Sequence, residues 1–402
     1  MYQLSSAVLS AIAAVAKVNV LEPHHRVPES IIEGVSRLSE MFTRRGDQGP
    51  GVAYFEEAQL RSAYLAYYVP VNLAKVQILL DELQPVLPAG WNEEFRVLDI
   101  GGGPGTGALS VLDWCRSKSV MPPPSLRMTV VDRSPQVLRL CAEILKVYGE
   151  QHPDQPIASV KTVECNLERS LSPALREVGM GNGYHLIIIQ NLLSELFVGS
   201  PDPVGLRTAL VGELLNYLAA DGSLMLIEPA SRSASRGLHQ VRDKLLAEQR
   251  CSVYSPCLHD APCPALVKPD DWCHEERIWE VPAWIAHVDR EVGFIKDALK
   301  FSYVILRKDG KTLVPRNVNY HRVVSELRVM KGEKRVWLCD ETGRPEIGRQ
   351  DKERSDSNAP FDDWHRGAIV RVSEIVKKDR KGRPAMVGRI VSSGTAEIVR
   401  PA

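Results

Sequence analysis

Half of the eight cysteines of this 402-residue chain crowd into one short segment. Cys257, Cys263 and Cys273 are spaced C-x5-C-x9-C and are interleaved with prolines, which disfavour a helix or a strand. Among protein-bound metals, thiolates select zinc or iron–sulfur clusters. The spacing supports a metal site and a coincidence of buried thiols equally. Because zinc usually takes more closely spaced cysteines, the metal interpretation tilts toward iron–sulfur.

A four-ligand site needs one more donor. Cys251, His259, His274 and the distant Cys339 compete for that place, and the spacing alone does not choose between them. Eight cysteines are few for a disulfide scaffold of this length, so a metal site in a reducing compartment is the better interpretation.

A second pattern with chemical meaning is the glycine-rich segment that begins at Asp99, in which Gly101, Gly103 and Gly105 alternate with other residues. Glycines let the backbone turn sharply and approach a ligand without Cβ clashes. The start of a following helix offers free N–H groups. A dinucleotide loop would need glycine where Thr106 stands. The spacing instead resembles the first motif of class I methyltransferases, which bind S-adenosylmethionine.

Polar residues at the ends of later strands complete this prediction. The Asp132 carboxylate matches the two ribose hydroxyls, and Glu164 or Asn166 could touch the adenine. Gln190 and Asn191 end the fourth strand, where class I methyltransferases place their catalytic residues. Gln190 is also a candidate contact of the cofactor. The two residues do not form the Asn/Asp-Pro-Pro-Tyr/Phe tetrad with which some methyltransferases methylate exocyclic amines. They also do not form the Pro-Cys nucleophile with which others methylate C5 of cytosine. Methyl transfer by proximity and alignment alone stays open.

These residues lie on alternating strands and helices that begin near residue 95. Apolar strands are predicted at 96–100, 128–132, 160–165, 184–191 and 222–228, with helices between them. That alternation favours a doubly wound parallel α/β sheet, the Rossmann-like fold of class I methyltransferases. The expected parts are a helical region at 1–90, the cofactor domain at 91–308 with a Cys-rich insert at 250–280, and a small basic OB-like β domain at 309–402.

The zero net charge hides an asymmetry. Residues 303–402 hold 22 Lys and Arg against 14 Asp and Glu, a surplus of eight. Such a surplus indicates a polyanion such as RNA or, equally well, a solvated surface. The best RNA-binding candidates are Arg371, Lys377, Lys378, Arg380, Lys381 and Arg383. No uninterrupted apolar run reaches about 18 residues, so no membrane partner is expected.

Several short motifs follow one another in a characteristic order. They are Leu38-Ser39-Glu40, Arg44-Arg45, Ala63-Tyr64-Leu65-Ala66, Leu98-Asp99-Ile100-Gly101, Leu193-Ser194-Glu195-Leu196, Glu228-Pro229, Pro256-Cys257, Cys263-Pro264, Trp272-Cys273-His274 and Phe301-Ser302-Tyr303-Val304-Ile305-Leu306-Arg307. Over roughly residues 28 to 370 the chain resembles the methyltransferase-like small-ribosomal-subunit assembly proteins, known from mitochondrial ribosomes and widespread in bacteria. The cysteine segment is more specific to this family than the glycine loop.

The resemblance implies a four-cysteine [4Fe-4S] cluster. Cys257, Cys263 and Cys273 match the clustered ligands, and Cys339, before an acid-and-glycine turn, matches the fourth, which leaves Cys251 as a spare. The family's P-C-P-H and C-H-F patterns differ here, because Leu258 and Glu275 replace packing neighbours of the ligands.

The resemblance also implies function. We expect an S-adenosylmethionine-binding, iron–sulfur-containing factor that acts on the small ribosomal subunit or its rRNA, with or without rRNA methyl transfer. The alternatives are a catalytically inactive RNA-binding structural factor and a small-molecule methyltransferase with a structural zinc. The protein is expected to be a monomer off the ribosome. It is expected in the bacterial cytoplasm or, in a eukaryotic host, in the mitochondrion.

Overall fold

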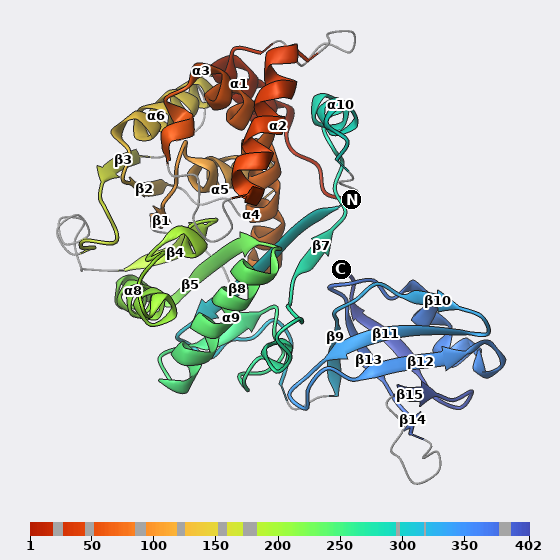
Figure 1. Cartoon of the computed structure of the whole chain (residues 1–402). Coiled ribbons are helices and arrows are strands. Elements are labelled where there is room, and N and C mark those ends of the chain that lie inside the picture. Colours follow the sequence, from red (N-terminus) through yellow and green to blue (C-terminus); the bar gives the residue numbers. More distant parts are fainter. Residues whose placement is uncertain are drawn as a thin grey trace. The chain divides into compact units, whose positions relative to one another are not determined.

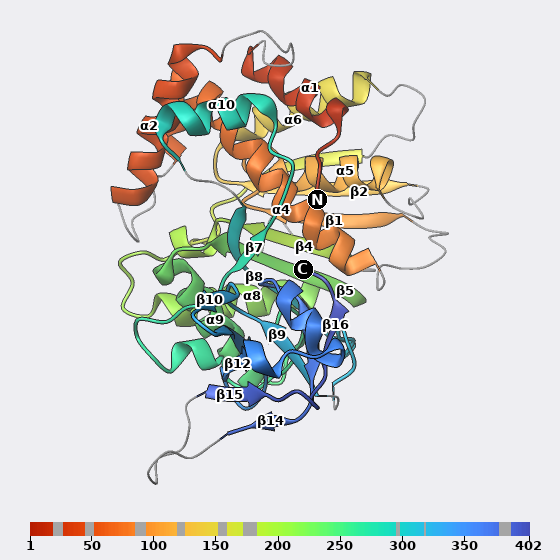
Figure 2. The same ribbon diagram turned by 90° about the vertical axis from the view of Figure 1, so that its right-hand side faces the viewer.

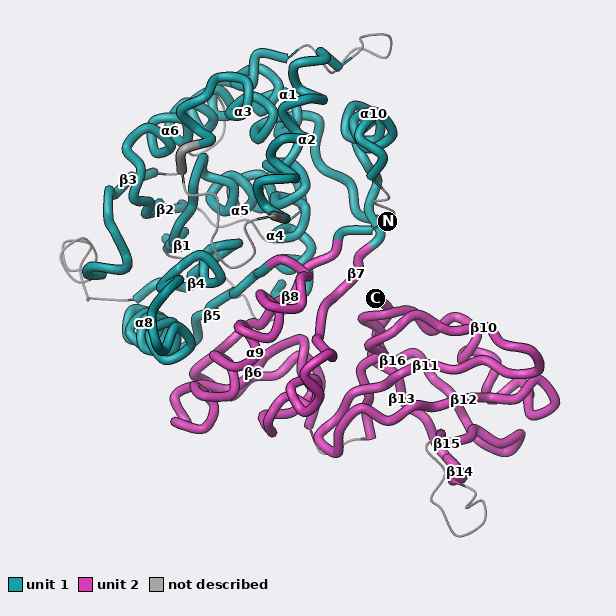
Figure 3. The backbone as a smooth tube through the Cα atoms, viewed as in Figure 1, with its two compact units in different colours: residues 1–228, 278–299 teal, residues 229–277, 300–402 magenta. Residues whose placement is uncertain are grey.

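The computed structural model describes residues 1–18, 27–44, 52–84, 94–118, 125–151, 159–171, 183–294, 298–316, 319–377 and 387–402. They form two compact units, drawn in different colours in Figure 3. Unit 1 comprises residues 1–228 and 278–299, and unit 2 comprises residues 229–277 and 300–402. The three-part division expected from the sequence stays a prediction.

Unit 1 contains a parallel sheet in the order β3-β2-β1-β4-β5 (Figure 1). Its strands are β1 (Phe95–Ile100), β2 (Leu126–Asp132), β3 (Ser159–Glu164), β4 (Tyr184–Gln190) and β5 (Leu218–Pro229). Val97, Leu98 and residues 187–189 expose no surface, as strands covered on both faces require. The doubly wound α/β sheet predicted from the sequence is confirmed.

The helices of unit 1 precede, separate and follow these strands. They are α1 (Ser6–Ala16), α2 (Glu29–Arg44), α3 (Ala58–Ala63), α4 (Val69–Leu83), α5 (Thr106–Ser117), α6 (Pro135–Glu150), α8 (Pro203–Tyr217) and α10 (Ala283–Val292), with short turns η1 (Val52–Phe55), η2 (Tyr64–Tyr68, a π-helix) and η4 (Leu193–Glu195). α10 lies beside α2 in both Figure 1 and Figure 2. The helical N-terminal region is confirmed. Within the described residues, no helix combines the length and apolarity needed to cross a membrane.

Unit 2 begins with a helix and three strands around the cysteine segment. These elements are α9 (Arg232–Ala247), β6 (Ser252–Ser255), β7 (Glu275–Arg277) and β8 (Leu299–Arg307). β6 pairs with β8 antiparallel, and β7 also pairs with β8. The chain between β6 and β7 has only the short turn η5 (Pro264–Leu266), in keeping with its prolines.

The rest of unit 2 is a β-rich region. Its elements are β9 (Tyr320–Val323), β10 (Arg328–Met330), β11 (Glu333–Cys339), β12 (Glu346–Gln350), η6 (Asp351–Glu353), η7 (Asp356–Asp363), β13 (Ile369–Val372), β14 (Ile375–Val376), β15 (Val387–Ile390) and β16 (Ala396–Arg400). Buried Val336, Leu338, Phe361 and Trp364 are part of its core.

The strand order of this region supports the OB-like expectation. β9 pairs with β11 and β13, β11 with β12, and β12 in parallel with β15. β15 pairs with β14, which follows β13 after two residues, so β13 and β14 act as one bent strand. The OB fold orders its strands in the same way, with the first beside the fourth and the third parallel to the fifth.

Candidate functional sites: a glycine loop and a four-cysteine site

The glycine loop, residues 101–105, connects β1 to α5 in unit 1. Gly101, Gly103 and Gly105 have φ of 64°, 55° and 84°, a left-handed backbone that residues with a Cβ rarely adopt. A Cβ on Gly105 would also lie 2.5 Å from Sγ of Cys141. The local backbone therefore needs glycine at these positions, as the sequence predicted.

The carboxylate of Asp99, in β1, packs against the glycine loop and the start of α5. Asp99 is 2% exposed, and its Oδ2 accepts the N–H of Ala108 at 2.9 Å. A Cβ on Gly102 or Gly107 would lie 2.7 or 2.6 Å from its carboxylate oxygens. Burial raises the pKa of Asp99 to about 7. Asp99 thus positions the loop, and its direct contact with a cofactor stays a prediction.

Asp132 ends β2 beside the glycine loop. Its oxygens accept the N–H of Gly103 at 3.0 Å and that of Ser134 at 2.9 Å. Burial raises the pKa of Asp132, and these backbone hydrogen bonds oppose the rise. A carboxylate has about four acceptor sites, which leaves capacity for ribose hydroxyls. On the next strand, Glu164 is the register neighbour of Asp132, and Asn166 follows it, both exposed.

Gln190 and Asn191 lie at the carboxyl end of β4, where the sequence placed them. The Gln190 side chain donates from Nε2 to the backbone oxygen of Asn72 in α4 at 2.9 Å. Asn191 has a φ of 52° and donates its backbone N–H to the oxygen of Ile227 at 2.8 Å. Their catalytic role stays a prediction.

The loop that follows β4, residues 191–197, is held from both sides. Glu228, 1% exposed, accepts the backbone N–H of Leu192, Leu193 and Ser194 at 3.0, 2.8 and 3.2 Å. Arg207 donates to the backbone oxygens of Ser194 and Leu196. Non-glycine left-handed residues, Asn191 and Phe197, bracket the loop. Such strain persists where the surroundings hold it in place, and it is concentrated at functional sites.

This loop presents Glu195, which sequence reasoning did not single out as a site residue. Part of Glu195 is exposed to solvent. Partial desolvation by the surrounding protein, followed by the negative charge of Glu228, raises the pKa of its carboxyl to about 7. Tyr54 and Tyr64 share a hydrogen bond, and burial followed by charges that include Glu195 and Asp132 raises the pKa of both. An acid and two phenols therefore gather near Asp132. The motifs that contain Tyr64 and Glu195 were the only sequence signal that could have drawn attention to them.

In unit 2, Cys339 of β11 comes close to the segment that holds the other three predicted ligands, since its Sγ lies 3.9 Å from Nε2 of His259. Burial raises the pKa of the Cys339 thiol, and negative charge on Cys273, Cys257 and Cys263 raises it further. β11 therefore lies near the segment between β6 and β7, and Arg344, which follows β11, is paired with Asp271 of that segment. We call the four cysteines the four-cysteine site. Within the described residues, no group of three or more His, Cys, Asp or Glu side chains is arranged to hold a metal ion.

The competing fourth donors lie in different surroundings. His259 Nε2 is 3.9 Å from Cys339 Sγ, and its Nδ1 is 3.1 Å from the oxygen of Ala261. His274 Nε2 instead lies 3.0 Å from a Glu276 oxygen. Burial, and then the negative charge of Asp260, raise the pKa of the Cys251 thiol to about 12.

Helix α9 holds the irregular cysteine segment through its polar side chains. Arg236 donates to the backbone oxygens of Ala265, Leu266, Lys268 and Asp271. Asp243 accepts the N–H of Cys263 at 2.9 Å, and Arg242 donates to backbone oxygens between Cys257 and Cys263. These contacts replace the ladder of hydrogen bonds that a strand would supply.

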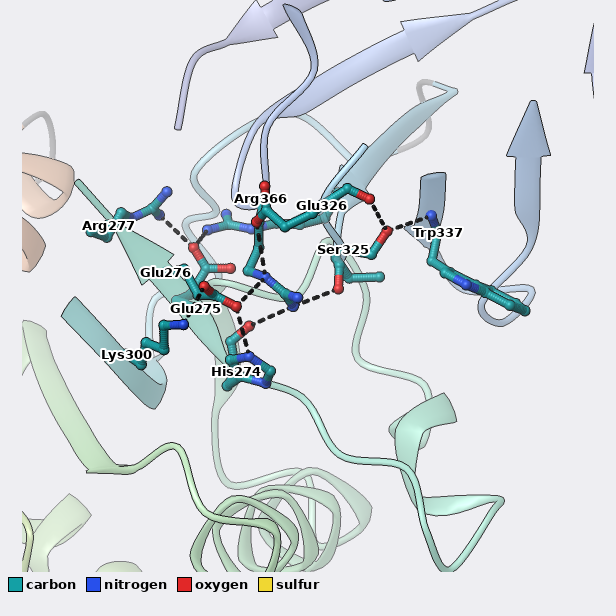
Figure 4. A network of polar contacts seen from close by, with 11 residues as sticks. His274, Glu275, Glu276, Arg277, Lys300, Ser325, Glu326, Trp337 and Arg366 are labelled. Carbon is teal, nitrogen blue, oxygen red and sulfur yellow. Dashed lines mark hydrogen bonds and ion pairs between the residues drawn. The ribbon is translucent and has the colours of Figure 1, made fainter. Parts of the chain in front are cut away.

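A network of polar contacts joins His274 and β7 to the β-rich region (Figure 4). Glu276 lies 3.0 Å from His274, 3.1 Å from Arg366 and 3.3 Å from Lys300. Arg366 also donates to the oxygen of Val324 at 2.6 Å. The strand β7, which begins two residues after Cys273, is thereby joined to the region that contains Cys339.

The predicted RNA-binding residues are described only in part. Arg371 is exposed, lies 3.4 Å from Glu397 and donates to the hydroxyl of Tyr320 at 3.0 Å. Lys377 is exposed as well. Lys378, Arg380, Lys381 and Arg383 lie outside the described residues.

Solved structures with a similar arrangement include methyltransferases. An O-methyltransferase family protein from Burkholderia thailandensis is 14% identical, with a TM-score of 0.32, covering 75% of this chain and 73% of its own. An arsenic(III) S-adenosylmethionine methyltransferase from Chlamydomonas reinhardtii is 18% identical, with a TM-score of 0.30, covering 69% and 85%. Likeness at this level does not bear on the activity.

Relatives by sequence point to one family. Two mitochondrial Rsm22-cox11 tandem proteins of Schizosaccharomyces pombe are each 24% identical over 262 residues, which is 61% of this chain. The chain spans only 31% of the length of these relatives. Residues 58–354, which include both candidate sites, match the family described as mitochondrial small ribosomal subunit Rsm22. The chain therefore belongs to the Rsm22 family.

Proposed function

We propose that this chain is an S-adenosylmethionine-binding, iron–sulfur-containing factor that acts on the small ribosomal subunit or its rRNA. The observation that carries the proposal is that Cys339 approaches the cysteine segment in a member of the Rsm22 family: its Sγ lies 3.9 Å from His259 Nε2, and the charges of Cys257, Cys263 and Cys273 act on it. Among protein-bound metals, thiolates select zinc or iron–sulfur clusters.

Cofactor binding is supported by the glycine loop and Asp132. The loop allows close backbone approach, and Asp132 keeps acceptor capacity for a vicinal diol beside it. Gln190, Glu164 and Asn166 lie at the same carboxyl edge of the sheet, where ligands of open α/β sheets bind. The glycine loop and Asp132 would bind the cofactor, whereas transfer of its methyl group needs a bound acceptor as well.

A [4Fe-4S] cluster is supported by the chemistry of the donors. Cys257, Cys263, Cys273 and Cys339 are all thiols, and the cationic side chains of Arg242 and Arg344 act on them. Bound there, the cluster would supply redox-active iron and link the cysteine segment to β11. A zinc ion is the alternative occupant of the same ligands.

Action on the small subunit or its rRNA is supported by family membership and by the β-rich region. OB folds bind oligonucleotides, and residues 303–402 carry a surplus of eight positive charges. Exposed Arg371 and Lys377 are placed in this region. The location in a bacterial cytoplasm or a mitochondrion, and the monomeric state, stay predictions.

The deciding experiment is ultraviolet crosslinking of the tagged full chain in its native host, followed by sequencing of the bound RNA. We expect enrichment of small-subunit rRNA over an unrelated tagged protein of similar size. Recovery of no more small-subunit rRNA than that control would contradict the proposal and favour the small-molecule methyltransferase.

Two measurements on protein purified without oxygen separate the remaining alternatives. Calorimetry with S-adenosylmethionine should show binding, whereas its absence would favour the inactive RNA-binding factor. Iron and sulfide with absorbance near 400 nm are expected, and a colourless zinc-containing protein would contradict the iron–sulfur assignment.

A further inference from the structure

Two arginines are built into the four-cysteine site. Arg242 comes from α9, and Arg344 follows Cys339 in the turn between β11 and β12. A buried guanidinium is destabilising unless negative charge or hydrogen-bond acceptors surround it. Their surroundings therefore indicate which charges the site is built to hold.

Arg242 sits inside the loop that runs from Cys257 to Cys263. Its side chain exposes no surface and donates to the backbone oxygens of His259 at 2.7 Å and Ala261 at 2.9 Å. Asp243 is its ion-pair partner. Burial lowers the pKa of Arg242, but the charges of Cys257, Asp243 and Cys263 outweigh burial and raise it.

One donor of Arg242 is left over. Its buried Nε has no hydrogen-bond partner among the described residues. Buried donors are nearly always paired, and an unpaired one costs about 1–3 kcal/mol. An anionic acceptor brought by a ligand would relieve this cost.

Arg344 ties the turn that follows Cys339 to the end of the cysteine segment. Its side chain is 15% exposed and is paired with Asp271, two residues before Cys273. Burial lowers the pKa of Arg344, and the charges of Cys273, Asp271 and Cys339 raise it. Arg242 thus acts on Cys257 and Cys263, Arg344 acts on Cys263, Cys273 and Cys339, and together the two arginines reach all four thiols.

We propose that Arg242 and Arg344 are counter-charges of the iron–sulfur cluster, which raise its reduction potential by stabilising its more negative, reduced state. This inference rests on the proposed function, because it needs the cluster. Four thiolates leave the oxidised cluster with net negative charge, and reduction adds one more electron. A nearby cation therefore stabilises the reduced form more than the oxidised form, and local charge is a known determinant of cluster potential.

The test is a redox titration of the anaerobically purified full chain, followed by electron paramagnetic resonance of the reduced cluster. The variants are Arg242→Met and Arg344→Met, which remove charge, and Arg242→Lys and Arg344→Lys, which keep it. Arg236→Met is the matched control. Arg236 lies on the same helix and also binds backbone oxygens of the segment, at Ala265 and Lys268.

We expect both Met variants to shift the midpoint potential to more negative values, and both Lys variants and Arg236→Met to stay near wild type. Equal shifts in the Lys and Met variants, or no shift in either Met variant, would overturn the inference. If Arg242→Met cannot hold a cluster, the Arg344 pair decides. Absence of iron and sulfide from wild-type protein would be a failure of the proposed function itself, visible before any titration.

Discussion

In the glycine loop of unit 1, the polar side chains already have protein partners, whereas the four-cysteine site of unit 2 contains groups that lack them. Asp99 and Asp132 each accept backbone N–H groups that belong to the loop or its neighbours. In unit 2, burial and the charges of three other thiols raise the pKa of Cys339, and the Nε of Arg242 is buried without a hydrogen-bond partner among the described residues.

This difference separates two kinds of binding site. A loop whose polar groups are satisfied keeps its shape with or without a ligand, and the ligand adds only its own binding energy. A site of converging thiols and buried cations depends on its ligand to balance charge, so binding and local stability are coupled. We expect unit 2 to be sensitive to loss of its metal and unit 1 to be less sensitive to loss of its cofactor.

The largest expected effect tests the coupled site. Cys339→Ser removes the ligand that comes from β11, and we expect loss of most bound iron and a less stable unit 2, measured by iron analysis and limited proteolysis. Cys251→Ser is the matched control, because Cys251 is the cysteine left over by the family pattern. Full iron content in Cys339→Ser would show that another donor, with His259 the nearest candidate, completes the site.

The next effect tests the preformed loop. Gly105→Ala places a Cβ at a φ of 84° and 2.5 Å from Cys141 Sγ, so we expect destabilisation of about 1–2 kcal/mol or more. Affinity for S-adenosylmethionine should fall about tenfold or more in calorimetry. Gly149→Ala, with open space around its Cβ in α6, should leave both unchanged or raise stability slightly. Wild-type affinity in Gly105→Ala would mean that the loop is not the cofactor site.

A smaller effect concerns the protonation of Asp99. Its pKa of about 7 in the folded chain lies above the value near 3.9 of an exposed aspartate, so the folded state binds the proton more tightly. The stability that it contributes is therefore full below about pH 4 and is lost as the pH rises to about 7. In urea unfolding, wild type should lose stability over this range relative to Asp99→Asn. A pH-independent difference would contradict the raised pKa.

The smallest effect concerns RNA. Arg371→Ala removes an exposed cation that is already paired with Glu397 and Tyr320. We expect a few-fold loss of affinity for rRNA fragments and a salt dependence reduced by about one ion. Arg232→Ala, an exposed arginine on α9, serves as the control. Equal losses in the two variants would indicate unspecific charge attraction.

Local patterns were predictable from the sequence. The glycine loop with its flanking strand and helix lies within about twenty residues, and left-handed backbone at Gly101, Gly103 and Gly105 follows from residue type. The parallel sheet follows from apolar runs such as residues 186–189, since only strands covered on both faces are apolar throughout. The β-rich C-terminal region followed from its short strand-like runs separated by turn-rich loops.

Contacts between distant residues were decided by the tertiary structure. Nothing local indicates that Glu228 holds residues 192–194, or that the Asp99 carboxylate accepts the N–H of Ala108 beside the loop. The approach of Cys339 to Cys257 was implied only by the family resemblance. The two residues are about eighty positions apart in the sequence, and only the folding of β11 against the cysteine segment brings them near each other. Arg242 lies in an ordinary amphipathic helix, and its burial among thiols depends on how the cysteine segment wraps around it. Composition and spacing determine which groups are present, whereas burial and long-range packing determine which of them meet.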